Sequence, residues 1–383
     1  MPFEVPSSWV WTTLGDIFTL QAGKNITSKD IHTEKSEEHK YSCFGGNGVR
    51  GYVSISNKTG EYPIIGRQGA LCGNVNLACG SFYATEHAVV VERYCDTDLM
   101  WVYYTLIALN LNQYATATAQ PGLAVNVIND VAIPLPPPHE QQRISKSIKI
   151  LFSFVETIEC EKLNLKTAIS QTKAKILDLA IHGQLVPQDP TDEPACELLK
   201  RINHKAEITS DNGHYQKLPE GWCECSFDDI FNITMGQSPN GCSINNQQGV
   251  EFHQGKILFG DKYLKQSDMF TNAPTKLATP NSLLLCVRAP VGVVNITQRE
   301  ICIGRGLCSL KPNAAINLDY AYHALTTYQS DFESKSTGST FKAISGSIIR
   351  NEVFALPPLQ EQYRIVTKIE EIFAQLDAIE ASL

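Results

Sequence analysis

The chain carries many side chains suited to binding a nucleic acid. Arg, Lys, Asn and Gln placed beside glycines or in polar turns can hold phosphates or read base edges through paired hydrogen bonds. In the first half of the chain these residues are Lys24, Asn25, Asn47, Arg50, Lys58, Arg67, Gln68 and Gln120. In the second half they are Gln237, Lys262, Lys265, Lys276, Arg288, Arg305 and Lys342. Any one of them could equally be a solvated surface side chain.

Arg67 and Arg288 stand out from this set because their numbers differ by 221, an offset that recurs elsewhere in the chain, and each follows an apolar run typical of a strand. The runs are Ile64-Ile65 and Leu283 to Val287. The offset predicts that the two arginines occupy the same position in two similar domains.

Three short motifs suggest enzyme chemistry, and none has the surroundings that the chemistry needs. Phe44 to Gly48 matches the F-x-G-x-G loop of methyltransferases, but the chain lacks the Asn-Pro-Pro-Tyr or Asp-Pro-Pro-Tyr sequence that orients a target amino group. A tight hairpin turn is the preferred interpretation. Asp331 to Lys335 contains an acid-x-Lys element without a paired acid upstream. Gly23-Lys24 lacks the preceding glycine of a phosphate loop. We therefore find no catalytic constellation.

Composition limits the function classes further. None of the 12 cysteines has the two-residue spacing of a zinc knuckle, so buried apolar thiols are expected. The net charge of −8 arises from 8 basic and 12 acidic residues in 1–138, 11 and 11 in 139–217, and 13 and 17 in 218–383. This balance argues against nucleic-acid binding unless the basic groups gather on one face. The sequence shows no apolar run of membrane-spanning length and no secretory signal at its beginning, so we expect a cytoplasmic protein.

A heptad pattern predicts one long helix at 139–182. Apolar residues recur every seven positions from Ile144 to Leu179, with a second set four positions further on, and the pattern breaks only at Lys162 and Thr172. Such a pattern is a coiled-coil seam. Glu140-Gln141-Gln142-Arg143-Ile144 returns, at the same offset of 221, as Glu361-Gln362-Tyr363-Arg364-Ile365 and opens a second helix at 359–383. We expect this second helix to cover the seam of the first.

The globular parts also repeat. Val5-Pro6-Ser7-Ser8-Trp9 returns as Leu218-Pro219-Glu220-Gly221-Trp222. Because the offset is 213 at the start of the copy and 221 at its end, the second copy has gained a net eight residues internally. We expect Trp9 and Trp222 to be equivalent core anchors. The predicted order is a domain at 1–138, the long helix, a linker with a short helix at 183–217, a domain at 218–358, and the second helix.

Each domain shows short strand-like runs broken by glycine and asparagine, together with one helical stretch. The runs include Tyr62 to Ile65, Ala88 to Val91, Lys256 to Phe259 and Ser282 to Val287, and the helical stretches are Leu99 to Leu109 and Leu318 to Tyr328. A short helix is predicted at Ala195 to Ile208. The fold class is therefore α+β, with an internal two-fold repeat.

Together these features resemble the specificity subunit of type I restriction-modification enzymes. The resemblance rests on Leu218 to Trp222, Leu356 to Gln362, Phe373 to Asp377 and Gly183 to Pro190, and it spans nearly the whole chain. It implies two target recognition domains, each binding one half of a bipartite DNA target, separated by long antiparallel coiled-coil helices.

The resemblance also implies that this chain is not itself an enzyme. Two methylation subunits dock on the helices and carry S-adenosylmethionine, and restriction subunits supply ATP- and Mg-dependent translocation and cleavage, so no cofactor is expected on this chain. One departure is the short second helix, which lacks a second copy of Gly183 to Pro190. A coiled-coil adaptor binding protein partners, and a methyltransferase or nuclease with an unrecognised site, remain the alternatives.

Overall fold

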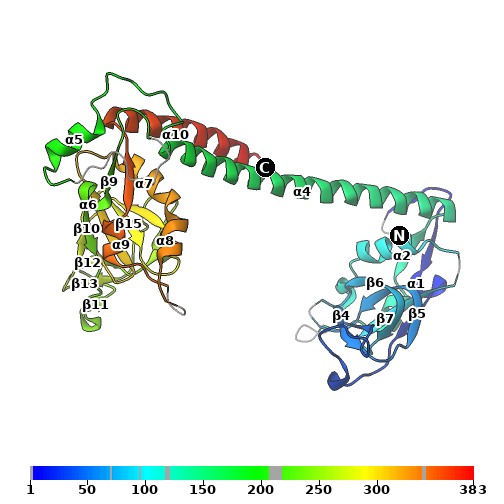
Figure 1. Ribbon diagram of the computed structural model, residues 1–383. Helices are drawn as coiled ribbons and strands as arrows, with labels where there is room; N and C mark the ends of the chain where they lie inside the picture. Colours follow the sequence, from blue (N-terminus) through cyan, green and yellow to red (C-terminus); the bar gives the residue numbers. More distant parts are fainter. Residues whose placement is uncertain (1–2, 70, 95, 117–120, 207–217, 339–341) are drawn as a thin grey trace. The chain divides into compact units, whose positions relative to one another are not determined.

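A computed structural model describes residues 3–69, 71–94, 96–116, 121–206, 218–338 and 342–383. The chain forms two compact units, Met1–Cys160 and Glu161–Leu383. Their boundary falls inside α4 (Pro138–Ile181), one uninterrupted helix that confirms the helix predicted at 139–182 (Figure 1). No described helix is both long and apolar enough to cross a membrane.

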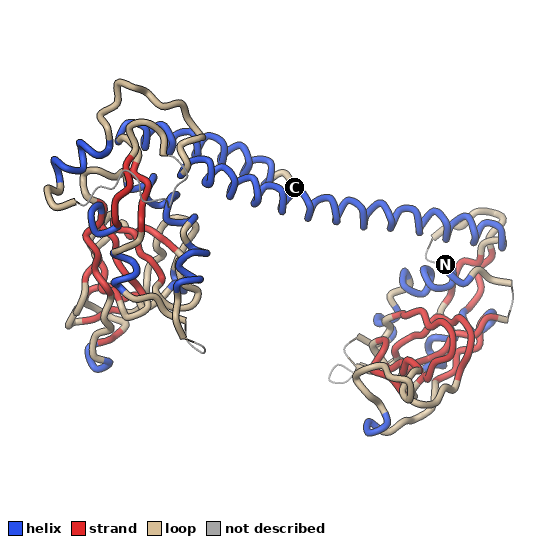
Figure 2. Tube along the Cα trace, viewed as in Figure 1, coloured by secondary structure: helices blue, strands red, loops and turns tan. Residues whose placement is uncertain are grey.

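Unit 1 contains one six-stranded sheet with the order β2-β7-β5-β6-β3-β4 and a separate antiparallel pair, β1-β8. The strands are drawn in red in Figure 2. Helix α2 confirms the helical stretch predicted at Leu99. The elements of the unit before α4 are β1 (Val10–Thr13), α1 (Leu14–Ile17), β2 (Phe18–Ala22), η1 (Ser28–Asp30), β3 (Tyr41–Gly45), β4 (Gly48–Val53), β5 (Lys58–Gly66), β6 (Val75–Ala84), β7 (Ala88–Arg93), α2 (Leu99–Ala108), η2 (Leu111–Tyr114), α3 (Val125–Asn129) and β8 (Ala132–Leu135).

Unit 2 repeats this plan, but its strands form a four-stranded sheet, β10-β18-β15-β16, and a five-stranded sheet, β11-β13-β12-β17-β14, beside the antiparallel pair β9-β19. Its elements after α4 are α5 (Ala195–Ile202), β9 (Cys223–Ser226), α6 (Phe227–Ile230), β10 (Phe231–Met235), η3 (Gly241–Ser243), β11 (Ile244–Asn245), β12 (Val250–His253), η4 (Lys256–Leu258), β13 (Phe270–Thr271), β14 (Leu277–Ala278), β15 (Ser282–Cys286), β16 (Val294–Thr297), β17 (Ile301–Ile303), β18 (Leu307–Pro312), α7 (Leu318–Thr327), α8 (Gln329–Lys335), α9 (Gly346–Arg350), β19 (Val353–Leu356) and α10 (Leu359–Ala381).

Two local predictions were wrong. Lys256 to Leu258 is not a strand but the 3-10 turn η4, which exposes 93% of Ile257, and only Phe259 at the end of the predicted run packs against a core cluster. The helix predicted at Ala195 to Ile208 ends as α5 at Ile202, where the Asn203 N–H still bonds to Leu199. Residues 207–217, in the predicted linker, lie outside the described chain.

The repeated Glu-Gln-x-Arg-Ile motif has a clear structural reason, since its glutamine is buried in both units. The Gln141 side chain accepts a hydrogen bond from the Asp98 N–H at 2.9 Å and donates to the Pro136 carbonyl at 2.8 Å. Gln362 accepts from the Asn317 N–H at 2.7 Å and donates to the Pro357 carbonyl at 3.0 Å. Asp98 and Asn317 are the N-caps of α2 and α7. One amide thus joins the start of each long helix to the domain helix beside it.

The two tryptophans predicted to be equivalent anchors differ in burial. Trp222 is 7% exposed, and its Nε1 donates to the buried carboxylate of Glu361 at 3.0 Å. Gln188, in the segment after α4, donates to the same carboxylate at 3.2 Å. Trp9 is only partly buried, and its Nε1 has no hydrogen-bond partner in the described chain. Trp222 is therefore a core anchor as predicted, and Trp9 is not.

Helix α10 covers the seam of α4 as expected, but only along the part of α4 that lies in unit 2. The two helices run antiparallel in unit 2, where Lys173 binds Glu380 at 3.4 Å and Ile169 and Ile176 are buried (Figure 1). Leu151 and Ile158, on the same seam in unit 1, are 62% and 65% exposed. The reason is length, since α10 has 23 residues and α4 has 44.

A buried histidine lies where α7 packs against α10. The His323 ring is 8% exposed and meets the Phe373 ring edge-on at 6.0 Å. Its Nε2 has no hydrogen-bond partner in the described chain. Burial, reinforced by the positive charge of Lys262, lowers the pKa of His323 to about 4. The imidazole is therefore packed in its neutral form.

We expect Gln362→Glu and Gln141→Glu each to lower the free energy of unfolding by about 3 kcal/mol or more, because a carboxylate oxygen would face buried carbonyl groups in place of an N–H donor. Gln360→Glu and Gln142→Glu change neighbouring exposed glutamines in the same way and should leave stability unchanged. Denaturant unfolding of the full chain measures this. Equal midpoints for the buried and exposed variants would contradict the role of the amide.

Acid should destabilise unit 2 through His323. Its pKa is depressed in the folded state, so the unfolded chain binds more protons as the pH falls below the ordinary value of 6.5. Between pH 7 and pH 5 the loss is about 2 kcal/mol. His323→Phe should remove that part of the acid sensitivity, whereas the exposed His204→Gln should keep it. Unfolding free energies of the three chains at both pH values give the comparison, and equal acid sensitivity in all three would refute the assignment.

Candidate nucleic-acid interface

Three segments of unit 1 converge on the turn between β6 and β7, which we call the central turn (84–88). The Lys24 N–H donates to Ala84 at 3.0 Å, and the Arg67 N–H donates to His87 at 2.9 Å. The Thr85 N–H donates to Phe44 at 2.9 Å. The Gly23 N–H donates to the Ala88 carbonyl at 3.0 Å. The ends of β2, β3 and β5 are thus fixed around one turn.

Unit 2 builds the same arrangement around its own central turn (303–307), between β17 and β18. The Gln237 N–H donates to Ile303 at 2.9 Å, and the Val287 N–H donates to Gly306 at 3.0 Å. The Gly304 N–H donates to the carbonyl of His253 at 2.7 Å. The Gly236 N–H donates to Leu307 at 2.9 Å. All four bonds have counterparts in unit 1, so the repeat extends into the interior where the two sequences differ.

Glycine allows these backbones to approach closely. A Cβ on Gly66 would lie 1.8 Å from the Gly46 carbonyl oxygen, and one on Gly236 would lie 2.2 Å from the Gly304 carbonyl oxygen. A side chain at either position would push the segments apart. These glycines therefore bring the ends of neighbouring strands together.

In unit 1 the structure brings three of the eight predicted binding residues to the central turn with their side chains exposed. Lys24, Asn47 and Gln68 are exposed on the converging segments, and Gly46 lies against the Gln68 carbonyl oxygen. The remaining predicted residues of this unit are Asn25, whose carbonyl accepts from Tyr83; Arg50, which donates to Ser28; Lys58, which pairs with Glu92; the partly buried Arg67; and Gln120, which lies outside the described residues.

In unit 2 the predicted residues divide into two groups. Five exposed ones lie on segments joined to the central turn: Gln237, Lys276, Arg288, Arg305 and Lys342. Lys262 lies elsewhere, where it binds Asp319 at 2.9 Å and Glu370 at 3.4 Å and so ties the domain to α7 and α10. Lys265 is exposed beside the polar cluster described below.

The predicted equivalence of Arg67 and Arg288 is wrong by one residue. The Leu123 N–H bonds to Arg67, whereas the corresponding Ile344 N–H bonds to Val287. Gln68 pairs with Gly122 as Arg288 pairs with Ala343. The offset seen in the helices is one too large here, because Gly66 ends β5 and its counterpart Cys286 ends β15. Gln68 is therefore the counterpart of Arg288.

Only one of the two central turns has a predicted binding residue at its third position. That position holds Glu86 in unit 1 and Arg305 in unit 2. Arg305 is among the predicted binding residues, and Glu86 is not. Aligning Ala84-Thr85-Glu86-His87-Ala88 with Ile303-Gly304-Arg305-Gly306-Leu307 would have revealed the match.

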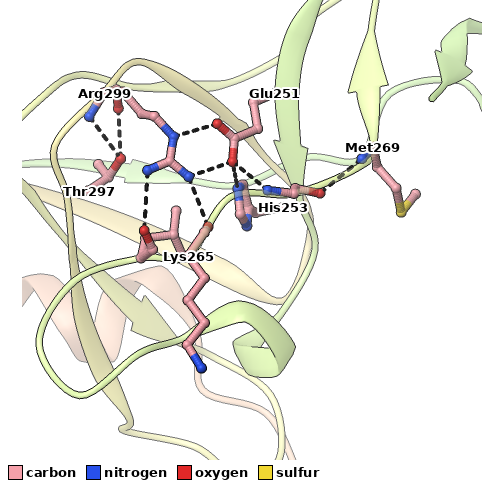
Figure 3. Close-up of polar contacts among 8 residues, drawn as sticks. Glu251, His253, Lys265, Met269, Thr297 and Arg299 are labelled. Carbon is pink, nitrogen blue, oxygen red and sulfur yellow. Dashed lines mark hydrogen bonds and ion pairs between the residues drawn. The ribbon is translucent and has the colours of Figure 1, made fainter. Parts of the chain in front are cut away.

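Unit 2 contains a buried ion cluster formed by Glu251, His253 and Arg299 (Figure 3). Glu251 on β12 accepts hydrogen bonds from Arg299 at 2.6 Å and from the Ser267 N–H at 2.8 Å, and its Oε1 lies 2.7 Å from Nε2 of His253. Burial opposes ionisation of Glu251, but these bonds prevail and lower its pKa to about 2. Because the His253 carbonyl receives the Gly304 N–H, the fixed carboxylate positions the strand that holds the turn.

The sequence motifs with possible enzyme chemistry have structural roles. Phe44 is buried against Phe82, and the following residues form the β3–β4 turn, as predicted for a hairpin. Lys335, at the end of α8, binds the Glu352 carboxylate at 2.7 Å. The described residues include no group of three or more potential metal ligands. Cys223 and Cys225 are buried thiols, and burial raises the pKa of Cys223 to about 12.

Comparison with known proteins gives consistent matches. The type I restriction modification DNA specificity domain matches residues 6–171 and 219–383. The EcoprrI specificity subunit of Escherichia coli is 41% identical over 167 residues, 44% of this chain and 41% of that protein. The putative MjaX specificity subunit of Methanocaldococcus jannaschii is 30% identical over 282 residues, 70% of this chain and 61% of that protein.

A solved structure shares the fold of this chain. The crystal structure of the HsdS subunit from Thermoanaerobacter tengcongensis superimposes with a TM-score of 0.61 at 21% identity, covering 100% of this chain and 93% of that one. The chain spans well under two thirds of the EcoprrI subunit and 61% of the MjaX subunit. With two matched segments that fill most of its length, the chain belongs to the family of type I restriction modification DNA specificity domains.

Proposed function

We propose that this chain is the DNA specificity subunit of a type I restriction-modification complex, in which each unit binds one half of a bipartite target. The observation that carries the proposal is the central turn, built twice with the same backbone bonds and surrounded each time by exposed polar side chains. A fixed backbone that presents variable polar side chains is what direct reading of base edges requires.

The acidic net charge is compatible with this role. Around the central turn of unit 2 the side chains of Lys276, Arg288, Arg305 and Lys342 form no ion pair within the described chain. Several acidic groups elsewhere are already neutralised, such as Asp319 by Lys262 and Glu352 by Lys335. The charge available to a polyanion is therefore more positive at the turn than the whole-chain value indicates.

Catalysis belongs to other subunits in this proposal. The exposed apolar residues of α4, which include Leu151, Phe154, Ile158 and Leu163, supply a surface for the methylation subunits. S-adenosylmethionine would be held by those subunits, and ATP and Mg by restriction subunits. This chain would only position the other subunits and select the DNA sequence.

The function is tested by purifying the chain with its methylation subunit and mapping methylated positions in genomic DNA. We expect one bipartite motif and binding that weakens steeply with salt, because released counterions drive phosphate binding. Arg288→Ala should weaken recognition of one half-site by about 1–3 kcal/mol, and Gln68→Ala should weaken the other. Arg201→Ala, on α5, is the control. Binding to a protein partner with no DNA preference would favour the adaptor alternative.

The helix α4 sets the distance between the half-sites in this proposal. Inserting seven residues between Ile158 and Leu163, where α10 does not cover the seam, should lengthen the helix by roughly 10 Å and keep its apolar phase. At about 3.4 Å per base pair, the gap in the methylated motif should grow by about three base pairs while both half-sites stay the same. An active complex whose half-sites keep their original separation would show that the length of α4 does not set this distance.

A further inference from the structure

The third positions of the two central turns have the same backbone setting and opposite charge. Their neighbours in the turn bond to the converging segments in the same way in both units, which leaves Glu86 and Arg305 at the apex of each turn. Arg305 is exposed, and the Glu86 side chain is 37% exposed. The two units thus place different side chains, a carboxylate and a guanidinium, at the same position of one shared backbone arrangement.

Glu86 lacks the partners that an acidic side chain normally has within a folded chain. Its Oε1 lies 3.2 Å from Nε2 of His87, while its Oε2 is buried and has no hydrogen-bond partner in the described chain. The Nδ1 of the neighbouring His87 and the Nε of Arg67, whose backbone N–H bonds to His87, are also buried and unpartnered in the described chain. Buried polar groups without partners are uncommon and need an explanation. Because the Glu86 side chain as a whole is 37% exposed, its carboxylate can meet a donor from outside the chain.

A carboxylate on a DNA-binding face is repelled by phosphates, so its partner must be an N–H donor on a base. In the major groove cytosine offers its N4 amino group, and the known preference of Glu and Asp is to accept from it. Adenine also carries an amino group, but its N7 acceptor lies beside it and would face the second carboxylate oxygen. A guanidinium suits the opposite pattern, the O6 and N7 acceptors of guanine.

We propose that the apex of each central turn is a specificity-determining position, with Glu86 reading a cytosine in the half-site of unit 1 and Arg305 reading a guanine in the half-site of unit 2. This inference rests on the proposed function and assigns its base contacts. It adds an acidic reader to a surface that was identified by its basic and amide groups.

The test uses the chain assembled with its methylation subunit, a methylome, and oligonucleotides that vary one base pair at a time across both half-sites. Glu86→Gln should reduce discrimination for cytosine at a single position of one half-site by about five- to a hundredfold. It should shift the preference there to adenine, because an amide both accepts from N6 and donates to N7. Arg305→Gln should act at a single position of the other half-site.

Glu61→Gln is the matched control, because Glu61 is exposed on β5 of the same unit and lines a separate acidic pocket with Glu92. The control should keep the wild-type motif. An unchanged preference in Glu86→Gln, or weakening that is equal for all oligonucleotides, overturns the proposal. Retention of the second half-site by Glu86→Gln verifies that the variant is folded. A wild-type complex with no bipartite motif would instead refute the proposed function itself.

Discussion

The buried glutamine amide at the start of each long helix is the constraint on which the rest of the structure depends. Gln141 and Gln362 each satisfy an N-cap N–H of a domain helix and a proline carbonyl that leads into the long helix. A buried amide that is bonded on both its oxygen and its nitrogen has one orientation. The angle at which each domain meets its helix is therefore set locally, by the same side chain in both units.

This link is repeated, but its surroundings are not. In unit 2 the segment after α4 wraps onto the domain, so that Gln188 and Trp222 share the Glu361 carboxylate and Gly183 lies against Pro219. In unit 1 Trp9 has no such cover and lines an open apolar pocket with Trp11 and Trp101. The repeat thus has one half closed by its own chain and one half with apolar surface exposed.

The start of each long helix was predictable from the sequence, because the glutamine of the Glu-Gln-x-Arg-Ile motif is itself required there. The interior was not, because its equivalences are carried by backbone bonds rather than by matching side chains. Arg67 and Arg288 aligned by spacing, but the bonds of Leu123 and Ile344 show that Gln68 is the true counterpart. Lys262 looked like a surface cation, although its charge is used by Asp319 and Glu370 in the fold.

The same fact explains how such a domain can change its specificity without losing its fold. The main-chain bonds of the central turn fix the positions of its third residue and of the segments beside it, and they place no demand on the side chains there. A carboxylate in unit 1 and a guanidinium in unit 2 occupy equivalent positions on the same backbone frame. Sequence choice is therefore separated from stability. The stabilising contacts lie in the strands beneath the turn and, in unit 2, in the buried cluster of Glu251, His253 and Arg299.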